Sequence, residues 1–238
     1  MLNETSNLNY TDSNANQSRR RFYRISSWNP IGENFTNSTF GKTVYYIKSK
    51  PSVNTRNWMG IYLETNVSDS KEALGEISNI TSFTMWNSTI QKRVTCNDFS
   101  CPDYPGCTLN NCNFNIEDGR GYEINLNLSS PIFTNWSIAG IVKSPVDVDL
   151  IKNSTSFGKN WISIDYNSSK KNAYNLISSV SYSDAVTNWN EFNQTSHGYI
   201  STGSPVPWIP PYIGTNFIIE PEKGYEVSVT QDSLYTQG

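Results

Sequence analysis

The chain has 238 residues, a net charge of −3 and only 16% charged residues. This charge gives no bulk electrostatic support for nucleic-acid binding, and no run approaches the roughly 18 apolar residues that span a membrane. No apolar stretch of a signal peptide stands at the N-terminus, although a processed chain would also lack one.

The first 40 residues are predicted to form an arm. Residues 1–18 are polar and poor in aromatic side chains, a composition that does not fold alone. A basic run follows (Arg19, Arg20, Arg21 and Arg24), interleaved with a strand-like stretch that holds Phe22, Tyr23, Ile25 and Trp28. We expect this candidate donor strand, within roughly residues 19–40, to lie against a sheet of this chain or of the next copy. The arginines fit a charged edge that discourages wrong pairing, and a processing site or an anionic partner is the alternative.

Residues 41–139 are predicted to form a first β-rich module. A strand over 57–63 would turn Met59, Ile61 and Leu63 inward, and the corresponding later residues Ile162, Ile164 and Tyr166 likewise. A short helix within 68–77 begins with Asp69 and Glu72 at the spacing of a capping box. Residues 82–87 then return to strand.

Four cysteines lie within 17 residues of this module: Cys96, Cys101, Cys107 and Cys112. An even, local cluster in a secreted-looking chain indicates two disulfides. Of the three possible pairings we favour the nested one, Cys96–Cys112 around Cys101–Cys107, because Cys96 and Cys112 lie at the two mouths of one loop. A zinc site is the alternative, although it needs tighter Cys-x-x-Cys spacing.

The module closes on the phrase NFNIEDGRGYEINLN at 113–127. Its pattern predicts a hairpin, with a strand NFNIE, a turn DGRG and an alternating strand YEINLN. The Gly before the Tyr is assigned to the turn.

The same phrase returns as NFIIEPEKGYEVSVT at 216–230, an offset of 103 residues. This offset also aligns Asn57-Trp58 with Asn160-Trp161 and Trp86-Asn87 with Trp189-Asn190, and it gives roughly three times the identities expected by chance. Residues 140–238 are therefore predicted to be a second module. The fold class expected is mainly β with one short helix per module, as two tandem sandwich- or barrel-like repeats. The recurring Trp and Phe side chains are expected to pack.

In place of the cysteine loop, the second module has STGSPVPWIPPYIGT at 201–215. Prolines stiffen this loop around Trp208 and Tyr212, and rigid exposed aromatic rings suit a sugar face or a protein neighbour. The alternative is that both rings pack back onto the module.

Asn-x-Ser/Thr acceptors are unusually dense. There are 13, where the composition predicts about 6 or 7 by chance, and this density favours an extracellular, N-glycosylated surface over accidental matches. The acceptors are Asn3, Asn9, Asn16, Asn34, Asn37, Asn66, Asn79, Asn87, Asn127, Asn135, Asn153, Asn167 and Asn193.

Catalysis has little support in the sequence. The chain has one histidine, His197, and no Gly-rich phosphate loop. Glu117 and Glu220 could be imagined as a carboxylate pair, but they are one position in two repeats and are expected to be structural. We expect no enzyme, no metal and no cofactor beyond covalent N-linked glycans.

The segments NWISI, AYNLISSV, VTNWNEFNQ and NFIIEPEKGYEVSV together resemble a repeat module of secreted and surface-layer proteins of archaea and bacteria. In that module a Trp-x-x-Ile-Ser strand precedes a short helix, and a Gly-Tyr hairpin closes the unit. Both copies match across residues 41–238, although NWMGIY lacks the Ser, and Gly119 or Glu222 stands in the turn. The resemblance implies an extracellular structural or adhesive module.

Tandem modules, dense acceptors and an extra strand also resemble subunits of environmental glycoprotein fibres. This resemblance implies a filament or surface-array subunit that joins copies of itself head to tail, as a helical homopolymer, by N-terminal strand addition. The alternative is a monomeric carbohydrate-binding adhesin module of a larger surface protein.

Overall fold

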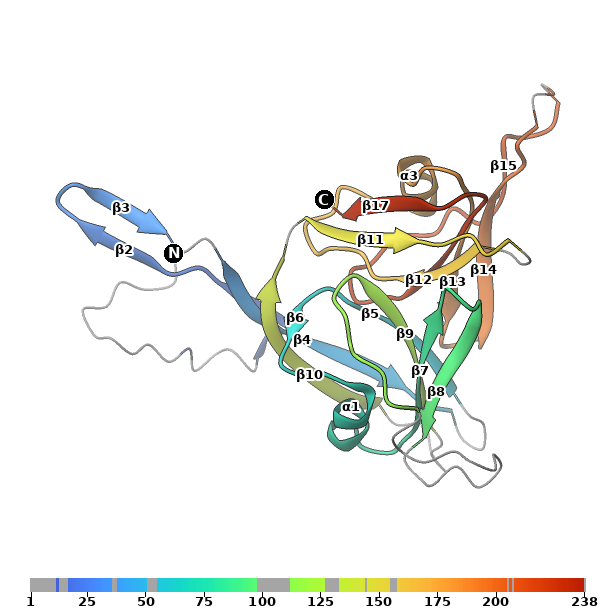
Figure 1. Cartoon of the computed structure of the whole chain (residues 1–238). Helices are drawn as coiled ribbons and strands as arrows, with labels where there is room; N and C mark the ends of the chain where they lie inside the picture. The colour runs from blue at the N-terminus through green and yellow to red at the C-terminus, as the bar shows by residue number, and fades with distance from the viewer. Residues whose placement is uncertain are drawn as a thin grey trace.

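The computed structural model describes residues 12, 17–35, 38–50, 55–97, 112–126, 133–143, 145–154, 158–204, 206 and 208–237. For residues 28, 29, 34 and 35 it describes the backbone alone. The predicted fold class is confirmed, since antiparallel strands dominate and the described residues include two short helices (Figure 1).

The first module is a four-stranded antiparallel sheet covered on one face. The sheet order is β5 (Thr55–Ile61), β9 (Arg120–Leu126), β7 (Ile80–Asn87) and β8 (Lys92–Asn97). The cover consists of helix α1 (Ser70–Glu76) and the covering strand pair β4 (Thr39–Lys48) and β10 (Phe133–Val142), with β6 (Glu64–Thr65) beside β10. Ile61, Phe83, Ile124 and Trp136 belong to the buried core of this module.

The second module repeats this arrangement. Its strand order is β12 (Gly158–Ile162), β16 (Tyr225–Val229), β13 (Ser183–Asn190), β14 (Thr195–Ser201) and β15 (Tyr212–Gly214). Strand β12 also pairs with β9 at Ile162 and Arg120, so the strands of both modules form one nine-stranded sheet. Helix α3 (Ala173–Ser179) and the strand pair β11 (Val146–Leu150) and β17 (Ser233–Gln237) cover it. Helix α3 and strand β13 begin and end exactly one offset after α1 and β7, and a separate core fills this module.

The N-terminal arm has two parts. Strand β1 (Arg20–Tyr23) pairs antiparallel with β4 of its own chain. Strands β2 (Ser26–Asn29) and β3 (Gly32–Phe35) pair with each other as a separate two-stranded sheet. We call β2, β3 and their turn the N-terminal ribbon. It projects well away from the two modules (Figure 1).

The predicted closing hairpin is wrong in its first half. Residues 113–117 form no strand, and one isolated bridge joins Asn115 to Asp69. The Phe114 carbonyl accepts a hydrogen bond from the Ser70 amide (2.9 Å), and the Asn113 side chain accepts one from the Lys71 amide (3.1 Å). These are amides of the first turn of α1, which have no partner inside the helix, so this part of the phrase serves to cap the helix.

The second copy caps its helix in the same way. Phe217 accepts from the Ala173 amide (2.9 Å), and the Asn216 side chain accepts from the Tyr174 amide (2.9 Å). The phrase then closes on its Tyr, because the Tyr225 hydroxyl accepts a hydrogen bond from the Glu220 amide, as Tyr122 does from Glu117. Both Glu side chains are exposed, and the Glu117 carboxylate pairs with Arg120 (3.4 Å), but the contact that the two copies share is made by the backbone amides.

The glycine of the phrase does not mark a turn. Gly121 lies inside β9, and a Cβ there would stand 2.9 Å from the carbonyl oxygen of Ile162 in the other module. A Cβ at Gly224 would stand 2.8 Å from the carbonyl oxygen of Met59. Glycine is needed at both positions because a strand of the opposite module crosses there at close range.

Two smaller expectations are also corrected. Asp69 caps α1 and accepts from the Glu72 amide (2.8 Å), but the Glu72 carboxylate accepts from the Ser68 amide and not from the Asp69 amide. Tyr166 is 36% exposed and not an inward core residue, because its ring receives the arm.

The two modules meet through reciprocal contacts. The Gly60 amide donates to the Glu222 carbonyl (3.0 Å), and the Ser163 amide donates to the Gly119 carbonyl (2.9 Å), which is the same bond with the copies exchanged. The Gln194 side chain likewise accepts from the Arg56 amide, and Gln91 from the Lys159 amide. Such self-complementary contacts indicate an approximate two-fold axis between the modules.

Four tryptophans line up across this axis. The ring centroids of Trp86 and Trp161 are 5.8 Å apart, those of Trp161 and Trp58 are 5.3 Å apart, and those of Trp58 and Trp189 are 6.0 Å apart. We call them the Trp row. The two central rings are buried, and their indole N–H groups donate to Glu123 and Glu226. The recurrence of Trp in the sequence therefore reflects packing between modules.

Candidate functional site

The N-terminal strand β1 lies in a groove that both modules build. Arg20 stands opposite Thr43 and Tyr23 opposite Phe40 in the register with β4. The Val44 amide donates to the Arg19 carbonyl (2.9 Å), which extends the pairing by one residue. The strand thus completes one edge of the covering pair of the first module.

Gly41 allows the close approach of β1. A Cβ at this position would lie 2.1 Å from the Arg21 carbonyl oxygen and 2.5 Å from the Phe22 ring. Any side chain there would push β1 off the edge of β4.

Side chains of the second module form the far wall of the groove. The Phe22 ring lies 4.7 Å from the Tyr166 ring, and the Arg20 guanidinium lies 5.3 Å from the centre of the same ring, as a cation–π contact. Phe22 also packs against the core of the first module. Strand β1 therefore bridges the two modules.

A buried carboxylate at the bottom of the groove gives it a charge preference. Glu222 is 2% exposed and forms ion pairs with Arg20 and, at 3.7 Å, with Arg19. A carboxylate this deep is stable only when it is paired, and removing one partner of such a pair typically costs roughly 3–5 kcal/mol. The basic run of the sequence thus has a specific partner.

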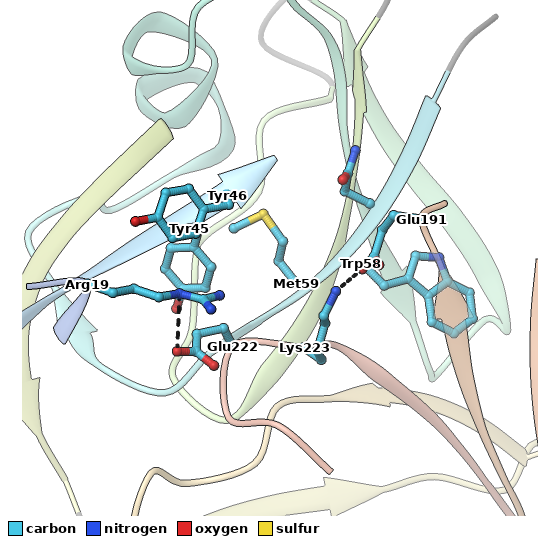
Figure 2. Close-up of a pocket in the computed structure, with 9 residues that line it drawn as sticks. Arg19, Tyr45, Tyr46, Trp58, Met59, Glu191, Glu222 and Lys223 are labelled. Atoms are coloured by element: carbon cyan, nitrogen blue, oxygen red, sulfur yellow. Dashed lines mark hydrogen bonds and ion pairs between the residues drawn. The ribbon is translucent and has the colours of Figure 1, made fainter. Parts of the chain in front are cut away.

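Beside Glu222 the modules leave a small crevice. Figure 2 shows Arg19 over Glu222 at one end and Lys223 with Glu191 at the other, against Tyr45 and other residues of the first module. Its volume of about 20 Å³ is enough for one water molecule and too small for a sugar. The crevice is a detail of the groove and no ligand pocket.

The groove has no equivalent in the second module. Glu222 corresponds to Gly119 in the first module, and Tyr166 corresponds to Leu63. Because the Val44 amide bonds to the residue just before β1 and such bonds recur every second residue in an antiparallel pair, the Lys42 amide is the next donor to β1. The residue that corresponds to Lys42 in the second module is Pro145, just before β11, and proline has no N–H to donate. Among the described residues, β11 pairs with β17 alone.

The predicted assembly residues fall in different places. Phe22 lies in the groove, Tyr23 stacks on Phe40 (5.8 Å between ring centroids), and Ile25 is exposed between β1 and the N-terminal ribbon. The side chain of Trp28 lies outside the described residues. The sequence did not single out Ile31, which is 97% exposed at the ribbon turn.

Cys96 and Cys112 are both buried thiols in the core of the first module. Burial and, to a smaller extent, a hydrogen bond with Cys112 together raise the pKa of the Cys96 thiol to about 11. The two thiols lie close enough to share a hydrogen bond, and the Cys96–Cys112 disulfide stays a prediction. Cys101 and Cys107 lie outside the described residues.

The predicted aromatic pair of the Pro-rich loop is divided. Trp208 is 83% exposed, whereas the Tyr212 ring stacks on Tyr199 (5.2 Å) and meets Tyr174 edge-on (5.4 Å). Tyr212 thus takes the packing alternative, and a single exposed ring remains.

Of the predicted glycosylation acceptors, five have exposed side chains: Asn66, Asn79, Asn135, Asn167 and Asn193. Asn87 and Asn153 are half-buried, and Asn153 donates to the Thr89 carbonyl. The backbone of Asn34 is described, and the acceptors at 3, 9, 16, 37 and 127 lie outside the described residues.

Within the described part of the chain, no group of three or more His, Cys, Asp or Glu side chains is placed to hold a metal ion. Neither described helix is long and apolar enough to cross a membrane. No protein-family model, curated protein or solved structure matches the chain.

Proposed function

We propose that this protein is a structural subunit of an extracellular, glycosylated filament or surface array. In this proposal the N-terminal strand segment of one copy adds to a sheet edge of the next copy. The observation that supports it most directly is the N-terminal ribbon, which projects from the modules as a two-stranded sheet with Ile31 97% exposed at its turn (Figure 1). An isolated two-stranded ribbon is only marginally stable in water, so a neighbour would stabilise it.

The difference between the segment that is given and the edge that receives it supports a head-to-tail arrangement. The given segment is β1 with the N-terminal ribbon, which extends away from the modules (Figure 1), and the receiving edge would be a strand of the neighbour's first module, as β4 is for β1 in its own chain. A contact between unlike ends is heterologous, and copies joined in this way continue as a filament when the rotation does not close a ring.

Two further observations support a structural role on the outside of a cell. The exposed acceptors, among them Asn66 and Asn135, could carry glycans without disturbing a core. The crevice at the module junction has room for one water molecule only, so the groove is better suited to a peptide strand than to a small substrate.

The experiment replaces residues 24–39 with Asn-Gly, between the paired residues Tyr23 and Phe40. Asn-Gly forms the tight turn that a two-residue hairpin prefers, so β1 keeps its place on β4 while the N-terminal ribbon is lost. We expect this variant to stay folded by circular dichroism and to give single particles by negative-stain microscopy, where the full chain gives filaments.

Two point variants serve as a matched control. Ile31→Ser should weaken filament formation, and Ile90→Ser, which also removes an exposed isoleucine but at the β7–β8 turn, should leave it unchanged. Filaments from the chain without the ribbon would contradict the role of the arm.

The alternative function is a monomeric carbohydrate-binding adhesin module. The exposed Trp208 ring on a proline-stiffened loop favours it. It predicts single particles from the full chain as well, together with glycan binding that Trp208→Ala removes.

A further inference from the structure

We infer that the groove under β1 is an exchangeable strand-acceptor site, which takes β1 of a second copy in place of the chain's own β1. We call it the β1 socket and define it by the β4 edge at Phe40–Thr43, Tyr166 and Glu222. The inference rests on the proposed function, because it names the site at which the next copy's strand is received.

Strand β1 is a short edge strand, held by its pairing with β4, by the stacking of Tyr23 on Phe40 and by the ion pairs at Glu222. Its four residues are all half-buried, and its side-chain contacts with the second module are those of Arg20 and Phe22, next to Arg19. Local opening of such a terminal edge strand requires less free energy than unfolding of the whole protein, even with the cost of unpairing Glu222 included. Strand β1 can therefore leave while both modules stay folded.

An empty β1 socket would select its occupant by chemistry. It would present the unpaired edge of β4, which any extended strand could satisfy. It would also present the buried Glu222 carboxylate, which needs a cation, and the Tyr166 ring, which accepts a guanidinium or an aromatic ring. A strand with arginine two residues before phenylalanine, as in β1 itself, meets all three requirements.

The number of sockets limits the architecture. Each copy has one β1, and the equivalent place in the second module has Pro145 at the edge and Gly119 in place of the acid. One strand given and one strand received per copy excludes branching, so copies join in an unbranched chain unless a reciprocal exchange or the rotation closes them into a dimer or ring. The N-terminal ribbon, which connects β1 to β4, is the segment that would open to let β1 reach a neighbour.

The test uses the full, folded chain with a protease site in place of residues 29–32, the turn of the N-terminal ribbon. Cleavage at this site after folding breaks the covalent link between β1 and β4, so β1 is then held by non-covalent contacts alone. A fluorescent peptide of residues 17–29 is then added, and its binding to the cut chain is followed by anisotropy. We expect the peptide to replace the original fragment.

Peptide variants probe the charge preference without changing the folded host. Arg20→Gln in the peptide should weaken competition at least tenfold, and Ser27→Ala, at an exposed position of the same peptide outside the β1–β4 pairing, should leave it within twofold. In the host, Glu222→Gln should weaken binding of the wild-type peptide, and Glu220→Gln, an exposed carboxylate two residues away, should not.

Equal competition by the Arg20→Gln peptide, or no exchange by any peptide while the cut chain remains folded, would overturn the inference. Microscopy of the uncut chain tests the proposed function separately. Exchange without filaments supports the β1 socket and contradicts the filament. Filaments without exchange support the filament and contradict the socket.

Discussion

Asn57 and Asn160 illustrate how one side chain joins two layers of a module. The Asn160 amide group accepts a hydrogen bond from the Ile151 amide (2.9 Å) and donates to the Gly158 carbonyl (2.9 Å). Asn57 accepts from the Lys48 amide and donates to the Lys48 carbonyl, both at 2.9 Å. Both residues are buried, and each ties the end of the covering strand pair to a strand of the main sheet, β12 for Asn160 and β5 for Asn57. An amide side chain has its donor and its acceptor on separate atoms, so one Asn can bind an amide and a carbonyl of the backbone at the same time.

Asn160→Ala should lower the free energy of unfolding by about 2–3 kcal/mol, because it leaves the half-buried amide of Ile151 and the buried carbonyl of Gly158 without the Asn160 side chain as a partner. The matched control is Asn175→Ala, at a half-buried position inside α3, where alanine favours the helix and stability should be unchanged or higher. Urea unfolding followed by fluorescence measures both variants. Equal stability of the two would show that the Asn160 bonds are replaced by water.

The repeated phrase shows which structural roles of single residues can be predicted from the sequence. The offset of 103 and the alternation after Tyr122 and Tyr225 are local patterns, so the strands β9 and β16 could be predicted. The reason for Gly121 is the backbone of Ile162, which lies in the other module. A glycine that allows two distant segments to approach closely looks the same in the sequence as a glycine in a turn. The local pattern alone cannot distinguish these two causes.

At the scale of elements, the strands and helices that bury one face were predictable, and those defined by tertiary hydrogen bonds were not. The short helices follow from an N-cap residue and an apolar pair, as Asp69 and Leu74 show for α1. Residues 113–117 have a strand-like composition, yet their hydrogen-bonding groups cap α1 in place of pairing with β9. The competing partner belongs to another element, which the phrase itself does not contain.

The Trp row is the element-scale contact that holds the modules together. Trp161→Ala should destabilise the protein by about 3–5 kcal/mol, because it removes a buried ring that contacts both Trp58 and Trp86. It should also reduce the near-ultraviolet circular dichroism of the stacked indoles. Trp208→Ala removes an indole that is 83% exposed and should change neither quantity. A Trp161→Ala variant as stable as Trp208→Ala would mean that the row contributes little.

At the scale of the molecule, the sequence predicts the two modules because they repeat. It does not reveal the β1 socket, because the residues of the socket occur only once. Arg20, Tyr166 and Glu222 come from three distant segments, and neither Tyr166 nor Glu222 has a like residue in the first module. Their meeting depends on the angle between the modules, which the reciprocal contacts at the two-fold axis set. The basic run alone could not identify the acid it pairs with.

The same contacts predict how the whole chain unfolds. Two modules of about 100 residues, each with its own core, would ordinarily unfold in separate steps. Here the bonds at Gly60 and Ser163, the Trp row and strand β1 all cross the junction, so unfolding one module exposes buried surface of the other. We expect one calorimetric transition, with the calorimetric enthalpy equal to the van 't Hoff enthalpy. The double variant Trp58→Ala/Trp161→Ala removes the centre of the junction and should split this transition in two. Two transitions in the unaltered protein would contradict the coupling, because the modules would then be joined in sequence and independent in stability.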